Sequence, residues 1–403
     1  VLKYCDEYDY KEAAEKEFDE EYGFTLSIRE HREDFCEEPK TKMTDVKKKT
    51  LLRDVLPAAL KLHSERLNVD PVKDMLKLPF KEEYPYLPNC TNASIPKDHR
   101  KKGISNADFM LYVGLTEKYV PVQICSKNEK DRPTSALIKF VPEEIDDTRH
   151  FIRFAAHEVA HALGFDIETI KNYINVTVEE KETGKKIVRL VKAPIVLDKM
   201  KGHYGCSDDD KCDEVIKKVA FENEPGKDAP LHWERRIAKD ELMSTYSPDL
   251  DVTGAYYTAL TLAVFHSMPF YRANFEMAEN MSWGKVAGCD FLEGKDKDII
   301  ITERPIPEKY SEMFCNEMEA VLECTSDRFA LGRCTKLNGI EAAKKYSPVY
   351  LQFSPETDTT DSKNDLTDGY PIIKPIHMTS CENGNVEYMP GSVVGNMSRC
   401  LKG

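Results

Sequence analysis

The chain has 403 residues, of which 41% are apolar and 32% are charged, and its formal net charge at pH 7 is -14. This length is enough for two or three domains with a substantial core. The negative charge argues against nucleic acid or an anionic membrane face as the main partner.

The N-terminal part predicts a charged segment, then a helix, then strands. Residues 1–45 are dense in charge and hold Cys5 and Cys36, which are placed to bridge and close a loop. From Lys47 onward apolar residues recur at spacings of three and four, which predicts a helix with a kink at Pro57. Three short strand-like runs follow, at 107–115, 120–125 and 136–141.

A helix is predicted next, at about 147–163. Asp146 or Asp147 can cap its N-terminus, and Gly164 lies just beyond its last turn. One side of this helix carries an apolar stripe, while two histidines project from another side. A helix with strands before it predicts an α+β domain whose active helix packs against a sheet.

The rest of the chain is expected to be less regular. Residues 166–231 are predicted as a long, mostly irregular insertion with a hairpin formed by 174–178 and 186–191. A second helical stretch is expected at 255–267. After Cys289, prolines, charges and five cysteines predict a loop-rich C-terminal domain held by disulfides.

Twelve cysteines without a Cys-x-x-Cys pattern indicate disulfides rather than a zinc finger, and therefore an oxidising compartment. Cys90 and Cys125 bracket the strand-forming region. Five Asn-x-Ser/Thr sequons agree with secretion, at Asn89, Asn92, Asn175, Asn280 and Asn396. No signal peptide or membrane span is visible, and a lipid anchor or stalk in a lost segment stays open.

The motif His157-Glu158-Val159-Ala160-His161 carries the strongest chemical signal. Histidines four residues apart lie on one helical face, so both imidazoles can reach one ion. Glu158 is placed to take a proton from a metal-bound water. The alternative is a core helix, in which two buried histidines flanking a glutamate would need several polar partners. The motif therefore predicts a zinc peptidase.

A catalytic zinc needs a third protein ligand and an open position. In a thermolysin-like arrangement that ligand is a downstream glutamate, and Glu179, Glu180 and Glu182 fall in that window, although their surroundings suggest a strand. In a metzincin arrangement the chain turns at Gly164, but the usual third histidine position holds Ile167. From the residues alone, the choice stays open between a glutamate and a histidine beyond the insertion.

Residues 157–165 (HEVAHALGF) are followed by His232, which precedes Met243 in HWERRIAKDELM, and 67 residues lie between Gly164 and His232. This pattern resembles the leishmanolysin family (peptidase family M8), the major surface metallopeptidases of trypanosomatids, in which a long insertion distinguishes the family from other metzincins. The nearest rival ligand, His203, has no Met-turn sequence behind it. Further matches are LHSERL at 62–67, GAYYTALT at 254–261, WG at 283–284, AGC at 287–289 and MFCNE at 313–317.

The resemblance implies a role for each residue of the motif. It implies that His157, His161 and His232 bind one catalytic Zn²⁺ and that Glu158 is the general base. It also implies that Met243 is the Met-turn residue beneath the metal.

The resemblance further implies how substrate is held. An extended peptide is expected to pair with an edge strand at Ala136, Leu137 and Ile138. Gly164 and Gly226 are expected to act as hinge or flap residues. From the resemblance we expect that the family's first strand and its latency pro-segment are not among these residues.

The expected fold class is α+β, with a metzincin-like catalytic domain of mixed sheet and active-site helix, a long insertion and a disulfide-rich C-terminal domain. The expected divisions are 1–166 with the zinc-binding helix, 167–294 with the third ligand and Met-turn, and 295–403. The bridges that the resemblance favours are Cys206–Cys289, Cys315–Cys334 and Cys324–Cys400, and it leaves the pairing of Cys212 and Cys381 open.

The predicted function is zinc-dependent hydrolysis of peptide bonds in proteins. We expect protein or peptide substrates, a monomer, no nucleic acid, and a secreted or cell-surface location, with any membrane attachment made through a segment outside these residues. Two alternatives are an adhesion or receptor-binding protein in which proteolysis is secondary, and a structural zinc protein. The intact Glu158 argues against the second, because a structural site has no use for a base.

Overall fold

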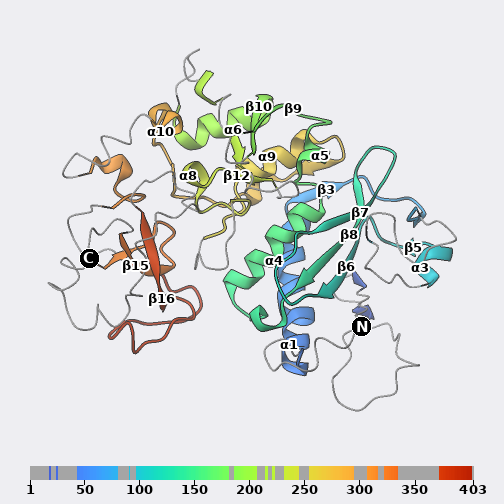
Figure 1. The fold of residues 1–403 in the computed structure, drawn as a ribbon, viewed down its shortest axis with the longest axis horizontal. Helices are drawn as coiled ribbons and strands as arrows, with labels where there is room; N and C mark the ends of the chain where they lie inside the picture. The colour runs from blue at the N-terminus through green and yellow to red at the C-terminus, as the bar shows by residue number, and fades with distance from the viewer. Residues whose placement is uncertain are drawn as a thin grey trace. The chain divides into compact units, whose positions relative to one another are not determined.

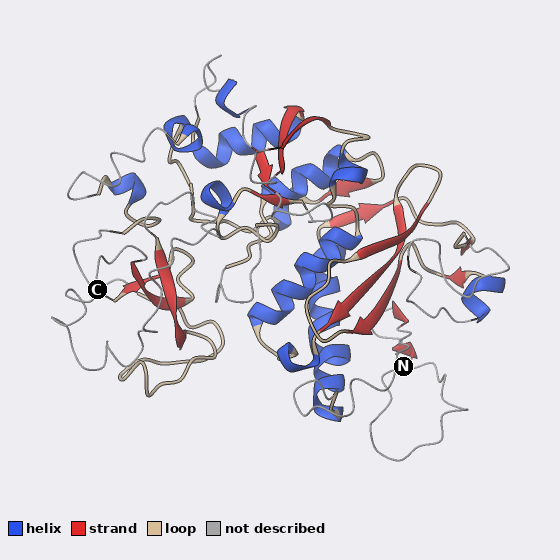
Figure 2. Cartoon of the chain, in the orientation of Figure 1, coloured by secondary structure: helices blue, strands red, loops and turns tan. Residues whose placement is uncertain are grey.

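The computed structural model shows a mixed α/β protein with several small sheets (Figure 2). The chain forms two compact units, each described separately below. The first comprises Val1–Ile174, Asp228–Pro230 and Val264–Met277, and the second comprises Asn175–Lys227, Leu231–Ala263 and Ala278–Gly403. The residues that the structure describes are 18–19, 24–25, 43–79, 90, 97–180, 186–206, 214–216, 220–222, 231–244, 254–294, 306–315, 322–334 and 372–401.

A three-stranded sheet supports the first unit, and it confirms the three predicted strands. Its order is β6 (Met110–Leu115), β8 (Pro133–Phe140) and β7 (Gln123–Lys127). Strand β8 runs parallel to β6 and antiparallel to β7. Seven of the eight residues of β8 are buried, which fits this position, because a central strand is covered on both faces.

The prediction that Ala136, Leu137 and Ile138 form an edge strand is therefore wrong. All three lie in the central strand β8, where Ala136 pairs with Ile124 of β7 and Ile138 pairs with Val113 of β6. Their backbone groups on both sides belong to neighbouring strands. A peptide would have to displace one of those strands to pair with them.

Helix α4 (Arg149–Ala162) packs against β8, and helix α2 (Leu56–Ser64) packs against α4 (Figure 1). The predicted boundaries of α4 are nearly right, but its cap is neither of the predicted aspartates. Thr148 caps the helix, and its hydroxyl oxygen accepts a hydrogen bond from the Phe151 backbone N–H at 3.2 Å. A β-region residue with a short hydroxyl side chain is well suited to this position.

The first long helical stretch is interrupted before Pro57, close to the predicted kink. Helix α1 (Asp45–Lys49) leads into a π-helical segment η1 (Thr50–Val55), after which α2 begins. Pro57 occupies the first turn of α2, where its missing N–H costs no hydrogen bond within that helix.

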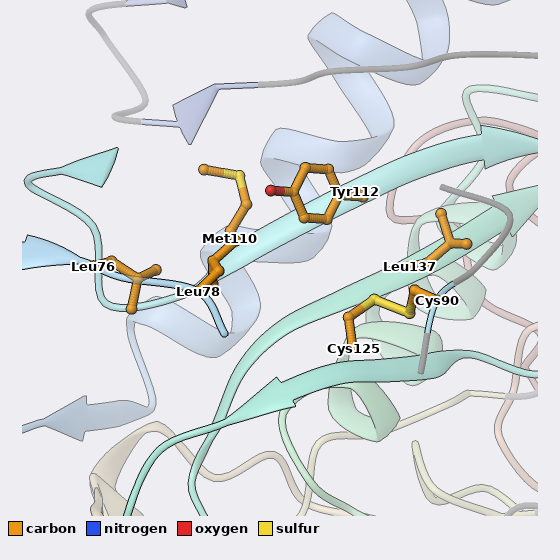
Figure 3. Close-up of a cluster of buried hydrophobic side chains, with 7 residues drawn as sticks. All are labelled: Leu76, Leu78, Cys90, Met110, Tyr112, Cys125 and Leu137. Atoms are coloured by element: carbon orange, nitrogen blue, oxygen red, sulfur yellow. A yellow bond between two sulfur atoms is a disulfide. The ribbon is translucent and has the colours of Figure 1, made fainter. Parts of the chain in front are cut away.

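A hydrophobic cluster covers the strands near the Cys90–Cys125 disulfide, which joins the two cysteines that bracket the strand-forming region (Figure 3). The cluster consists of Leu76, Leu78, Cys90, Met110, Tyr112, Cys125 and Leu137. The remaining elements of this unit are β1 (Phe18–Asp19), β2 (Phe24–Thr25), β3 (Leu67–Val69), β4 (Met75–Leu76), α3 (Lys97–Lys101), β5 (Ile104–Ser105), η2 (Pro142–Glu144), α5 (Ile167–Ile170), β13 (Tyr271–Ala273) and η3 (Phe275–Met277).

The second unit contains the predicted hairpin, formed by β9 (Asn175–Glu180) and β10 (Lys186–Lys192). The sheet continues through β11 (Ala220–Glu222) to β12 (His232–Trp233), with all neighbours antiparallel. Glu179 and Glu180 thus lie in a strand, as their surroundings suggested.

The insertion is more regular than predicted, because it contains the 11-residue helix α6 (Pro194–Tyr204). A proline in the first turn and Gly205 in the left-handed conformation at the end are the usual boundary signals. The second predicted helix also differs, since α9 (Ala259–Ser267) begins late. Ala255 has a φ of 42°, which a right-handed helix does not allow.

The C-terminal region is held by disulfides as predicted, and it also contains an antiparallel sheet. The strands are β14 (Glu323–Cys324), β15 (Ala330–Cys334) and β16 (Ile373–Ser380). Short elements of the second unit are α8 (Arg235–Ala238), α10 (Cys289–Glu293) and η4 (Glu308–Tyr310). None of the helices in the described ranges is long and apolar enough to cross a membrane. The expected three-part division of the chain remains a prediction.

The cysteine pairing agrees with two of the three bridges that the resemblance favours. Cys315–Cys334 and Cys324–Cys400 are confirmed. The Cys206–Cys289 pairing is wrong, because Cys289 is disulfide-bonded whereas Cys206 takes part in no disulfide. Cys381 is a buried thiol packed beside the Cys324–Cys400 bridge. Cys5, Cys36 and Cys212 lie outside the described residues.

Candidate metal centre

Helix α4 carries the two histidines and the glutamate of the sequence motif. His157, Glu158 and His161 are 3%, 2% and 5% exposed. The 3.6-residue repeat brings the two imidazoles together, with their Nε2 atoms 3.1 Å apart and their ring centres 4.7 Å apart. The helix therefore presents two ring nitrogens to one point.

The turn after α4 fixes the orientation of His161. Gly164 has a φ of 107°, and a Cβ atom there would lie 3.1 Å from Thr169 Cγ2. This turn brings the Phe165 carbonyl within 2.8 Å of His161 Nδ1. A carbonyl only accepts, so Nδ1 carries the proton and Nε2 presents its lone pair. The predicted hinge residue Gly164 is thus a tight-turn residue.

Burial controls the charges on this helix. It lowers the pKa of His161 to about 3, with a smaller contribution from the charge of His157. It raises the pKa of Glu158 to about 8, and the hydrogen bond from Tyr119 opposes that rise. A neutral imidazole is the form that binds a metal ion.

In the second unit, the segment from His232 to Met243 leaves strand β12 and returns beside it. His232 is 4% exposed and pairs with Glu222 of β11. The Trp233 N–H donates to the Met243 carbonyl at 2.8 Å, and Trp233 Nε1 donates to Thr261 Oγ1 at 2.9 Å. Met243 is consequently buried next to the strand that carries His232.

Glu241 holds this returning segment in place. Its carboxylate accepts hydrogen bonds from the Met243 N–H, from the Thr258 N–H at 3.3 Å and from the Thr258 hydroxyl at 3.0 Å. Burial raises the pKa of Glu241 to about 7, and these donors oppose that rise. A buried carboxylate is tolerated here because both of its oxygens are occupied.

The ligand atoms of His157, His161 and His232 all lie within 4.8 Å of one another, and all three residues are buried. In the described part of the chain, no other histidine, cysteine or acidic residues form such a group of three. Three histidine nitrogens are a donor set found in catalytic zinc sites, where water or substrate takes the fourth position. These residues therefore fit a zinc ion.

The remaining predicted site residues are not part of the three-histidine group. The rival ligand His203 lies outside this group, and its Nε2 donates to the Trp283 carbonyl at 2.8 Å. The sequons at Asn175, Asn280 and Asn396 are exposed. Gly226, Asn89 and Asn92 lie outside the described residues.

Two polar contacts of α4 were not foreseen from the sequence. Tyr119 donates from its hydroxyl to Glu158 Oε1 at 3.1 Å, and His63 Nε2 donates to the Ala156 carbonyl at 2.8 Å. His63 lies in the LHSERL motif, but no local signal links either residue to α4.

These features describe a mixed α/β protein with a buried three-histidine group suited to a metal ion. The family model for leishmanolysin, peptidase family M8, matches residues 20–403. The chain therefore belongs to the leishmanolysin peptidase family.

Individual relatives agree with this membership. Leishmanolysin of Leishmania chagasi is 28% identical over 378 residues, which cover 90% of this chain and 58% of that protein. A leishmanolysin homolog of Crithidia fasciculata is 32% identical over 379 residues, which cover 90% of this chain and 53% of that protein. A leishmanolysin-like peptidase of Drosophila melanogaster is 27% identical over 292 residues, which cover 58% of this chain and 40% of that protein. The chain spans little more than half the length of the first two relatives.

Proposed function

We propose that the chain is a zinc-dependent endopeptidase of the metzincin type, with His157, His161 and His232 as the metal ligands. The observation that carries this proposal is the group of three buried histidines, one of which adjoins a buried glutamate, in a member of the leishmanolysin family. Neither the family nor the site favours the alternative of an adhesion protein, or that of a structural zinc protein.

The mechanism follows from the positions of these side chains. When bound, zinc acts as a Lewis acid that polarises the scissile carbonyl and makes water more acidic. Glu158 acts as the general base, takes a proton from the attacking water, and passes it to the nitrogen of the leaving amine. Met243 supports the site as the Met-turn residue, through its backbone bond to Trp233.

The role of Glu158 is tested with Glu158→Gln. We expect kcat on an unfolded protein substrate to fall by about 10²-fold or more, because general-base catalysis contributes about that much. Bound zinc measured by mass spectrometry should be unchanged, and a chelator should abolish cleavage by the wild-type chain. Glu168→Gln, at an exposed glutamate of α5, is the matched control and should cleave normally. Equal cleavage by Glu158→Gln and the wild-type chain would reject the mechanism.

The third ligand is tested by metal content. We expect His232→Ala to lose bound zinc and activity, because two imidazoles alone hold the ion weakly. His203→Ala should keep both, since His203 lies outside the histidine group. Full zinc occupancy in His232→Ala would contradict the ligand assignment.

We also propose a secreted or cell-surface monomer that acts on protein or peptide substrates. The disulfides and the exposed sequons at Asn175, Asn280 and Asn396 support this location. N-glycosidase treatment of the chain expressed through a secretory pathway should increase its electrophoretic mobility. A chain secreted without glycans would contradict the modification.

A further inference from the structure

The loop between β6 and β7 brings a tyrosine to the helix that carries the proposed general base. The Tyr119 hydroxyl donates to Glu158 Oε1 at 3.1 Å, and both residues belong to the first unit. Within the described residues, this is the one side-chain hydrogen bond that the Glu158 carboxylate accepts. The buried carboxylate therefore depends on Tyr119 for its orientation.

The loop is built to hold that hydroxyl in place. At its start, the Thr116 N–H donates to the Phe140 carbonyl at 3.0 Å, and the Thr116 hydroxyl donates to the Lys118 carbonyl at 2.9 Å. Lys118 immediately precedes Tyr119, so the turn fixes where the tyrosine leaves the loop.

The ring of Tyr119 is held by an aromatic contact with α4 itself. Its centre lies 6.2 Å from that of Phe154, one helical turn before Glu158. Phe154 in turn packs edge-on against Phe140 of β8 at 6.4 Å. The tyrosine ring thus packs on α4, and β8 supports the phenylalanine that it contacts. Tyr119 is 38% exposed, so water could serve as a hydrogen-bond partner for its hydroxyl. The bond to Glu158 is therefore not a mere consequence of burial.

We propose that Tyr119 is a positioning residue for Glu158 in the peptidase reaction, an inference that rests on the proposed function above. By holding Oε1, the hydroxyl restricts the rotation of the carboxylate and leaves Oε2 to exchange the proton with the attacking water and the leaving amine. A general base works only within hydrogen-bond reach of its proton, and a third group often orients it. The tyrosine itself does not touch the reacting atoms.

The first test is Tyr119→Phe in the zinc-loaded chain, which keeps the ring contact with Phe154. We expect kcat to fall about tenfold or more, the effect of losing a hydrogen bond to a charged group. KM and zinc content should be unchanged. The matched control is Tyr173→Phe, which removes a hydroxyl that donates to the Lys130 carbonyl elsewhere in the same unit. This control should keep the wild-type kcat.

The second test uses thermal unfolding of the zinc-free chain and needs no activity. Tyr119→Phe should lower Tm, because the buried Glu158 loses its partner. In a Glu158→Ala background the same substitution should leave Tm unchanged, since the two residues interact directly. An equal loss of Tm in both backgrounds would overturn the proposal.

The outcomes separate this inference from the proposed function. If the wild-type chain shows zinc-dependent cleavage and Tyr119→Phe keeps full kcat, the positioning role alone is rejected. Loss of zinc from Tyr119→Phe would also overturn it, since that result indicates a role in folding the metal-binding helix. A wild-type chain without zinc-dependent cleavage rejects the proposed function, and the positioning role with it.

Discussion

His63 is a single buried side chain that links helix α2 to helix α4, which carries two of the proposed metal ligands. Its Nε2 donates to the carbonyl of Ala156, the residue before His157. Burial lowers the pKa of His63 from 6.5 to about 4, with smaller contributions in the same direction from Arg66 and Arg153, while the bond to Ala156 opposes the shift. The folded chain thus keeps this histidine neutral near pH 6, where an unfolded chain begins to protonate it.

The consequence is a stability that depends on pH. Because the pKa of His63 is lower in the folded chain, its contribution to the free energy of unfolding is complete above pH 6.5. This contribution is lost as the pH falls toward 4. A shift from 6.5 to about 4 corresponds to about 3 kcal/mol. His63→Gln can still donate to Ala156 but does not titrate. We therefore expect denaturant unfolding of the zinc-free variant to show a weaker pH dependence over this window.

The control for this prediction is His266→Gln, at an exposed histidine of α9. Its pH dependence should match that of the wild-type chain. An unchanged pH dependence in His63→Gln would show that His63 is protonated as easily in the folded chain as in the unfolded one.

At the scale of elements, the stretch from β12 to Met243 is held in place by the Glu241 carboxylate rather than by regular secondary structure. Only β12 and the four-residue helix α8 are regular there. The Leu242 N–H donates to the Tyr256 carbonyl at 2.8 Å, and Glu241 binds the N–H groups of Met243 and Thr258. These bonds fasten the returning segment to the chain before α9.

Replacing Glu241 by glutamine should weaken that connection. An amide keeps one acceptor oxygen, and its NH₂ group would face an N–H donor of either Met243 or Thr258. We expect Glu241→Gln to destabilise the chain by about 2 kcal/mol, measured by denaturant unfolding. Glu276→Gln, at an exposed glutamate, is the control and should have little effect. Equal stability of the two variants would contradict the role of Glu241.

At the scale of the whole molecule, disulfides tie together segments that are far apart in sequence. Cys324–Cys400 joins residues 76 positions apart, whereas Cys315–Cys334 joins residues 19 positions apart. A cross-link restricts the unfolded chain, and a longer loop loses more entropy when it is closed. The longer bridge should therefore stabilise the second unit more than the shorter one.

Paired substitutions test this order without leaving a cysteine unpaired. Removal of Cys324–Cys400 by two alanine substitutions should cost about 4 kcal/mol, and removal of Cys315–Cys334 about 3 kcal/mol. Unfolding free energies measured under oxidising conditions give the comparison. A greater loss from the shorter bridge would indicate that native-state contacts, rather than loop entropy, dominate.

Part of this fold was predictable because its signals are local. The extent of α4 follows from helical periodicity and from Gly164, and strands β6 to β8 follow from short apolar runs. Helix α6 was missed although Pro194 and Gly205 mark its ends, because Ile195 and Val196 favour strands and the surrounding residues are polar.

The sequence by itself determined that His157 and His161 lie on one face of a helix, with Glu158 beside them, because helical hydrogen bonds fix the geometry of residues four positions apart. It also pointed to His232 and Met243 through a family resemblance. Only the tertiary structure decided that β8 is central, that Tyr119 reaches Glu158 and that His232 lies close to the histidine pair. These contacts join residues distant in sequence, and packing and strand pairing select them rather than any local pattern.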